Sequence, residues 1–116
     1  MKLSSESKQQ LILALLGQEE DPKPVGDSVL QRFLKIGKTY HIRTVTMDYA
    51  GTLKDFDQQH IVLTEASWVA DSGRFNEYLR DTSKINENEP YKNDVIVNVG
   101  SISDITEIDN PCREVK

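Results

Sequence analysis

Hydrophobic and polar positions alternate through the middle and near the end of the chain, and this pattern predicts a mainly β protein. Residues 39–44 alternate in one phase and residues 45–49 in the opposite phase, so we expect a bulge, bend or turn near residues 43–44. The run 60–70 is rich in β-formers and is expected to be a strand partly buried on both faces. Two short strands should meet around Gly100.

Three segments have the spacing of short amphipathic helices. Residues 4–16 place apolar side chains on one helical face, and residues 28–36 begin with a capping box. A brief helix is also expected within residues 71–81. The next stretch, residues 82–94, is polar and turn-rich, and we expect it to be an exposed, mobile loop.

The length of 116 residues suits one domain with one core, without disulfide or metal staples. We expect this domain to span residues 27–110, with an insertion at residues 67–94. Residues 1–26 should form the leading helix and an acidic, proline-containing linker, and residues 111–116 a polar tail.

The composition and charge of the chain argue against several classes of function. A formal net charge of -5 argues against sequence-independent nucleic-acid binding, which depends on lysine and arginine. The single cysteine, Cys112, cannot form an intramolecular disulfide or a multi-thiolate metal site, so a reducing compartment is expected. The apolar run 11–16 is too short for a signal peptide, and no stretch approaches the roughly 18 apolar residues that span a bilayer. We expect a cytoplasmic protein that does not enter membranes.

Two groups of residues resemble the two sequence motifs of the Sm/LSm superfamily, which includes Hfq. The first group is Gly37, Tyr40, Ile42, Tyr49, Gly51, Leu53, Phe56, Asp57, Ile61, Leu63 and Ala66, with Gln58 completing an Hfq-like Phe-Asp-Gln string. The second group is Val97, Asn98, Val99, Gly100, Ser101, Ile102 and Ile105. The chain is similar to a divergent branch of this superfamily.

The resemblance implies a small, strongly bent, five-stranded Sm-like barrel with an N-terminal helix, to which residues 4–16 add an extra leading amphipathic helix. A short open barrel leaves edge strands with unpaired backbone groups, and pairing with identical copies would satisfy them. We therefore expect a homo-oligomeric ring, hexameric or heptameric by resemblance, that holds single-stranded RNA near loop tips at its pore.

The sequence also departs from the family pattern. The string from Phe56 to Leu63 is one residue longer than its bacterial counterpart, and the base-contacting asparagine has no clear equivalent, His60 being nearest. Val99 stands where Sm proteins usually carry arginine, and the Lys-His pair of Hfq is absent near Gly100. The usual pocket therefore lacks its cation, and the insertion 67–94 is long for this family.

The resemblance places candidate RNA-binding residues at two turns: Asp57, Gln58, His60, Gly100 and Ser101. Polar loop tips can bind single-stranded bases by hydrogen bonding and stacking. The alternative is a solvated turn, and His60 could instead fill a gap in the core or bond to the backbone.

The aromatic residues Trp68, Phe75 and Tyr78 could form a stacking platform for bases. The alternative of buried packing or a subunit contact is favoured, because aromatic side chains most often supply apolar area to cores and interfaces. The tract 71–74 could bind an anion at a helix start, but a plain helix cap is the better interpretation.

No catalytic or metal-binding pattern is found. His41 and His60 lack metal-ligand spacing, no glycine-rich phosphate loop is present, and Cys112 has no local activating context. We expect neither a cofactor nor enzymatic activity. Two functions stay open: a ring that binds single-stranded RNA, or a structural ring that captures a protein partner through the insertion 67–94.

Overall fold

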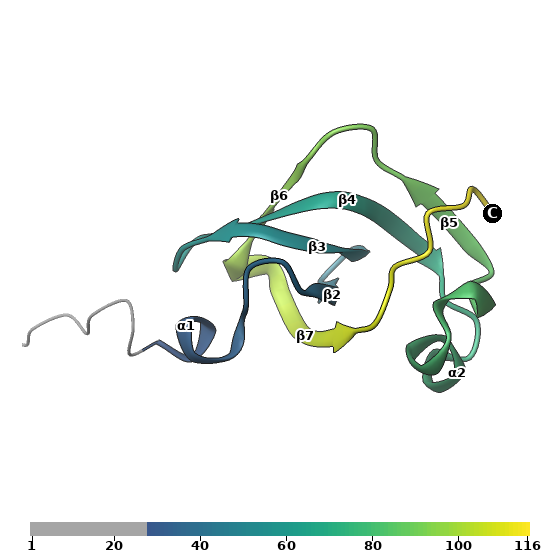
Figure 1. Ribbon diagram of the computed structural model, residues 1–116, viewed down its shortest axis with the longest axis horizontal. Coiled ribbons are helices and arrows are strands. Elements are labelled where there is room, and N and C mark those ends of the chain that lie inside the picture. The colour runs from purple at the N-terminus through teal and green to yellow at the C-terminus, as the bar shows by residue number, and fades with distance from the viewer. Residues whose placement is uncertain (1–27) are drawn as a thin grey trace, which may run out of the picture. The chain divides into compact units, whose positions relative to one another are not determined.

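The computed structural model describes residues 28–116, so the expected leading helix 4–16 and the linker up to residue 26 lie outside the described residues. The chain divides into two units between Arg32 and Phe33, and only residues 28–32 of the first are described (Figure 1). The sheet and the candidate site lie in the second unit.

The short helix expected at residues 28–36 is present as α1 (Val29–Phe33) but ends earlier. Its start is capped, because the Ser28 hydroxyl accepts a hydrogen bond from the Gln31 amide at 3.0 Å. Beyond it, the Lys35 amide donates to the Tyr40 hydroxyl at 2.9 Å. The chain therefore leaves the helix to bond to the sheet before Gly37.

Six antiparallel strands form one sheet, which confirms the prediction of a mainly β protein. The expected count of five strands is wrong, because residues 87–90 add a strand that no hydrophobic alternation marks. The strands are β2 (Thr39–Thr44), β3 (Asp48–Phe56), β4 (His60–Asp71), β5 (Glu87–Pro90), β6 (Val95–Asn98) and β7 (Ile102–Ile108). Their order is β5-β4-β3-β2-β7, with β6 paired to the first half of β4. The predicted change of phase corresponds to a tight turn, in which the Thr44 amide donates to the Met47 carbonyl at 2.9 Å.

The sheet bends sharply where β3 crosses β4. At Gly51 an added Cβ would lie only 3.0 Å from the Ala66 Cβ, so the two strands approach more closely there than a side chain allows. Glu65, beside this contact, has φ of 49°, and the β3–β4 register shifts at Gly51 itself, between Ala50 and Thr52. The long strand β4 can therefore pair with β6 before the bend and with β5 after it (Figure 1).

Of the expected insertion 67–94, residues 67–71 belong to β4, and the rest contains an ordered wing of helix α2 (Phe75–Arg80), 3-10 helix η3 (Thr82–Lys84) and strand β5. The prediction of a mobile loop over residues 82–94 is wrong, because β5 pairs with β4 and Ile85 is buried. An apolar cluster joins the wing to the sheet; its buried members are Ala50, Val69, Tyr78, Ile85 and Ile108.

The expected polar tail at residues 111–116 lies against β4 and β5. Lys116 and Asn88 exchange two backbone hydrogen bonds, of 3.0 and 3.1 Å. The Asn88 side-chain amide donates to the carbonyls of Cys112 and Glu114, and the Arg113 guanidinium donates to the Ala66 carbonyl at 2.6 Å. The tail is thus bonded to both β4 and the wing.

Candidate functional site

Asp57 and the two glutamines that follow it form the tip of the β3–β4 hairpin. The Asp57 carboxylate accepts hydrogen bonds from the backbone amides of Gln59 and His60, both at 2.7 Å. These bonds lower the pKa of Asp57 from its usual value. Asp57 is therefore committed to closing the turn, and its oxygen Oδ1 is already occupied.

Gly100 and Ser101 lie in the 3-10 turn η4 (Val99–Ser101), which connects β6 to β7. The Asn98 side chain accepts from the Gly100 amide, and the Ser101 hydroxyl donates to the Asn98 carbonyl, each at 2.8 Å. The Val99 amide donates to the Gln59 carbonyl at 2.8 Å. This bond brings the two turns together, so all five candidate residues lie at one end of the sheet.

Gln58, Gln59 and His60 expose their polar side chains at this end. Gln58 is exposed, and the His60 side chain is 49% exposed, with Nδ1 at 3.6 Å from the Asp57 carboxylate. Neither turn contains lysine or arginine between residues 56–61 or 98–102. The site can therefore hydrogen-bond to the edge of a base, but it offers no cation to a phosphate.

The aromatic candidates do not form one platform. Tyr78 is buried, and its ring stacks on Phe75 with the centroids 6.0 Å apart. Trp68 is 38% exposed and belongs to the opposite face of β4, because its neighbours Ser67 and Val69 are both buried. Tyr78 therefore offers no surface for a base, and the favoured interpretation of buried packing describes it.

A buried polar cluster around His41 was missed by the sequence analysis. His41 is fully buried, with Nδ1 at 2.8 Å from the Tyr78 hydroxyl and Nε2 at 3.1 Å from the Asp48 carboxylate. Burial lowers the pKa of His41, and the Asp48 carboxylate opposes that shift. In the neutral ring, Nε2–H donates to Asp48, and Nδ1 accepts from Tyr78. The cluster therefore bonds α2 to the sheet, and its histidine is enclosed rather than available for catalysis.

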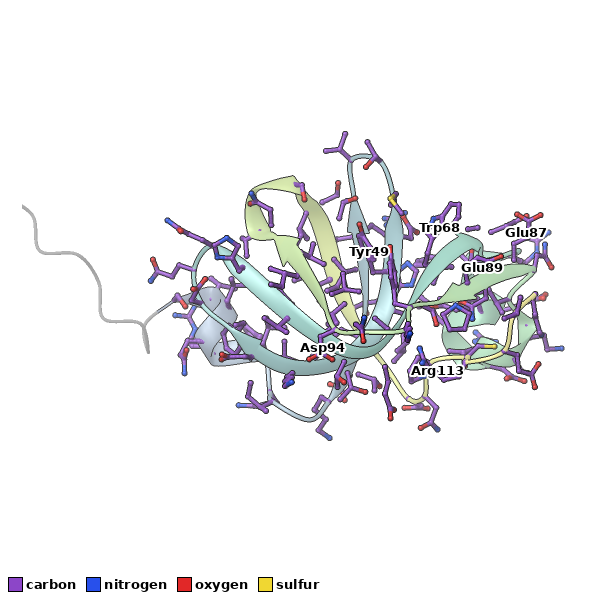
Figure 2. All side chains as sticks on the ribbon, turned by 90° about the horizontal axis from the view of Figure 1, so that it is seen from above. Tyr49, Trp68, Glu87, Glu89, Asp94 and Arg113 are labelled. Carbon is purple, nitrogen blue, oxygen red and sulfur yellow. The ribbon has the colours of Figure 1, made fainter. Side chains whose placement is uncertain are left out.

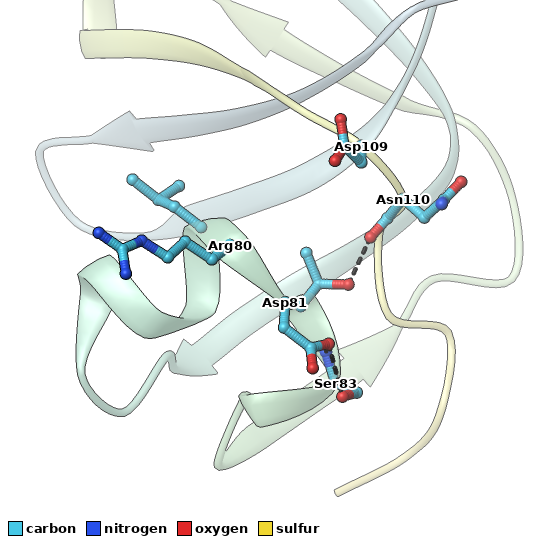
Figure 3. Close-up of a pocket in the computed structure, with 7 residues that line it drawn as sticks. Arg80, Asp81, Ser83, Asp109 and Asn110 are labelled. Carbon is cyan, nitrogen blue, oxygen red and sulfur yellow. Dashed lines mark hydrogen bonds between the residues drawn. The ribbon is translucent and has the colours of Figure 1, made fainter.

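A hollow of about 240 Å³ lies beside α2 and η3 (Figure 3). Its polar groups bond to one another: the Ser83 hydroxyl donates to Asp81 at 2.7 Å, and the Thr82 hydroxyl donates to the Asn110 carbonyl. The Asp71–Arg74 tract gives α2 no side-chain cap, so the expected helix cap is absent there. Within residues 28–116 no cluster of histidine, cysteine and acidic side chains could hold a metal ion.

Comparison with known proteins gives no family assignment. No family model matches the chain, and no curated protein matches it. Among solved structures, it is similar in fold to a heptameric archaeal Sm protein (TM-score 0.47, 17% identity, 63% of this chain and 88% of that chain). It is likewise similar to the P. aerophilum SmAP1 heptamer (TM-score 0.48, 17% identity, 65% and 84%). No helix in the described part of the chain is long and apolar enough to cross a membrane.

Proposed function

We propose that this chain is a subunit of a ring of identical copies, in which β6 of one copy pairs with β7 of the next. The observation that carries the proposal is the strand pairing. Among the described residues, β6 pairs only with β4 and β7 only with β2. Each of these two strands thus has one edge with unsatisfied backbone groups. Pairing β6 of one copy with β7 of the next satisfies both edges, and repeating this head-to-tail contact closes a ring.

The exposed side chain of Ile96 on β6 provides the test of assembly. Ile96 is 68% exposed, and Ile96→Lys places a charge on the proposed contact. Val45→Lys is the matched control, because Val45 is 81% exposed in the turn between β2 and β3. Multi-angle light scattering should show a ring for the unchanged chain and for Val45→Lys, and smaller species for Ile96→Lys. A monomeric unchanged chain would refute the ring.

The ring would bind single-stranded RNA through its paired turns. The exposed Gln58 amide and His60 ring can bond to bases, which supports this activity, and the missing cation favours contacts with bases over contacts with phosphates. The test is a binding isotherm at low salt with U-rich and A-rich oligonucleotides. Gln58→Ala with His60→Ala should weaken binding, whereas Asn76→Ala, an exposed amide on α2, should not. No binding by the intact ring would remove this activity.

Capture of a protein partner through residues 67–94 is the second candidate function. The observation that favours it is the ordered wing, whose Tyr78 and Ile85 are buried in the apolar cluster. An insertion that folds back into the core presents a defined surface rather than a random loop. Glu87→Gln with Glu89→Gln, which changes exposed side chains of the wing outside the apolar cluster, should weaken partner capture and leave the ring.

A further inference from the structure

One face of the sheet carries a row of side chains from the three adjacent strands β3, β4 and β5. Tyr49 of β3 lies opposite Trp68 of β4, and Trp68 lies opposite Glu89 of β5. Directly opposed residues of antiparallel strands project from the same face. The adjacent pair Val69 and Asn88 is buried, so it faces the core and the Trp68 row faces outward (Figure 2).

This row offers an aromatic surface to solvent. The Tyr49 ring stacks on Tyr91 with the centroids 6.1 Å apart and the planes 28° apart. Trp68, beside them, is the only tryptophan of the chain and is 38% exposed. An indole ring that keeps this much surface in water on a sheet face can accept a flat cation or an apolar chain.

Carboxylates border the aromatic row. Glu87 and Glu89 are exposed, two residues apart on β5, and Asp71 pairs in register with Glu87. None of these three acids forms an ion pair within residues 28–116, whereas Asp104 and Asp94 are each paired with a basic residue. The border of the row is therefore negatively charged and uncompensated.

A groove of about 350 Å³ continues the row at the end of β4 and contains Trp68, Met47, Asp48 and Asp71 in its lining. Asp48 gives oxygen Oδ2 to His41, and its side chain is 32% exposed. Arg43, the cation that interacts with Asp48, is bound by Asp104 and lies over the Phe75 ring. The groove is thus lined by Trp68, Met47 and two acidic residues, one of which, Asp48, already bonds to His41 on the core side of the sheet.

We propose that this surface, from the groove to Glu89, binds a lysine- or arginine-rich segment of a partner protein. A guanidinium or ammonium group stacks on Trp68 while the carboxylates pair with it and its neighbours. RNA is disfavoured here, because the same carboxylates repel phosphates although the rings could stack on bases. The proposal rests on the second candidate function and names its partner's chemistry; it does not depend on RNA binding or on the ring.

Trp68 itself reports the binding, since its emission is the tryptophan signal of the whole chain. The probe is a short capped peptide of alternating arginine and serine, and its counterpart has glutamate in place of arginine. The basic peptide should change Trp68 emission saturably at low salt, and the acidic peptide should not. A response that is absent, or equal for both peptides, overturns the proposal.

Two charge-matched double variants locate the contact. Glu87→Gln with Glu89→Gln should weaken binding by roughly 3- to 30-fold, as the loss of two exposed ion pairs implies. Asp55→Asn with Asp109→Asn changes the net charge equally at exposed positions outside the row and outside β6 and β7, and should alter affinity less than about twofold. Equal weakening by both pairs would indicate net charge alone and refute the site.

Trp68→Leu, measured by anisotropy of a labelled basic peptide, should also lose binding while thermal unfolding stays cooperative. Unchanged affinity of Trp68→Leu for the peptide would show that the peptide does not contact Trp68, and would refute the proposal. Light scattering on the same samples reports the ring separately. A failure of peptide binding is thus distinguishable from a failure of assembly.

Discussion

Gly51→Ala is expected to destabilise the fold because of the close crossing of β3 and β4. The new Cβ would lie 3.0 Å from the Ala66 Cβ, 3.1 Å from the Ala66 Cα and 3.2 Å from the Leu63 Cβ. All three atoms belong to or adjoin the β4 backbone, which cannot move away as the far end of a flexible side chain would. Overpacking of this kind costs about 1–3 kcal/mol. For a domain of this size, each kcal/mol lowers Tm by roughly 4–8 °C.

The assay is equilibrium unfolding in urea, followed by circular dichroism. Gly100→Ala is the matched control, because its Cβ would meet only the Asn98 side chain, at 3.2 Å, in an exposed turn. We expect it to cost less than about 0.5 kcal/mol. Adding Ala66→Gly to Gly51→Ala should restore part of the loss, a coupling of about 0.5–3 kcal/mol. Equal stability of Gly51→Ala and the unchanged chain would refute the close crossing.

Three further predictions concern the buried polar groups. Tyr78→Phe should cost about 1–3 kcal/mol in urea unfolding, because His41 Nδ1 then lacks its donor; a neutral result would contradict the bond. Since burial lowers the pKa of His41 in the folded chain, the unfolded chain binds the proton first, so the free energy of unfolding should fall as pH drops below about 6.5. That decrease should vanish just below about pH 6.5 in His41→Gln, and its persistence there would implicate another group. Asn88→Ala should release residues 111–116, seen as faster hydrogen exchange there, whereas Asn76→Ala should leave the exchange unchanged.

The strands could be predicted from the sequence wherever one face of the sheet packs against the core. Strand β5 could not, because its buried residue is Asn88, whose amide bonds to carbonyls of the tail, so no hydrophobic alternation marks it. The burial of His41 could not be predicted for a similar reason. His41 lies between buried Tyr40 and Ile42, and the face of the strand from which it projects is covered by α2, which is distant in the sequence. Contacts of this kind become visible only once the insertion is folded.

The candidate site was predicted by resemblance rather than by pattern. The Phe-Asp-Gln string located the hairpin tip, and the glycine between two strands located η4, but only the bond from Val99 to Gln59 shows that the two turns meet. The separation of Trp68 from Phe75 and Tyr78 depends on which face of the sheet α2 covers. That choice is made by nonlocal packing of Tyr78 against Ala50 and Val69.

The bonds between Lys116 and Asn88 have a consequence for assembly. They occupy backbone groups on the rim of β5, where a foreign strand would otherwise dock. A further strand could pair with this edge of β5 only after displacing the C-terminal segment. Within the described residues, no segment covers the free edges of β6 and β7 in this way. The tail thereby directs strand addition toward one pair of rims and discourages branching into aggregates.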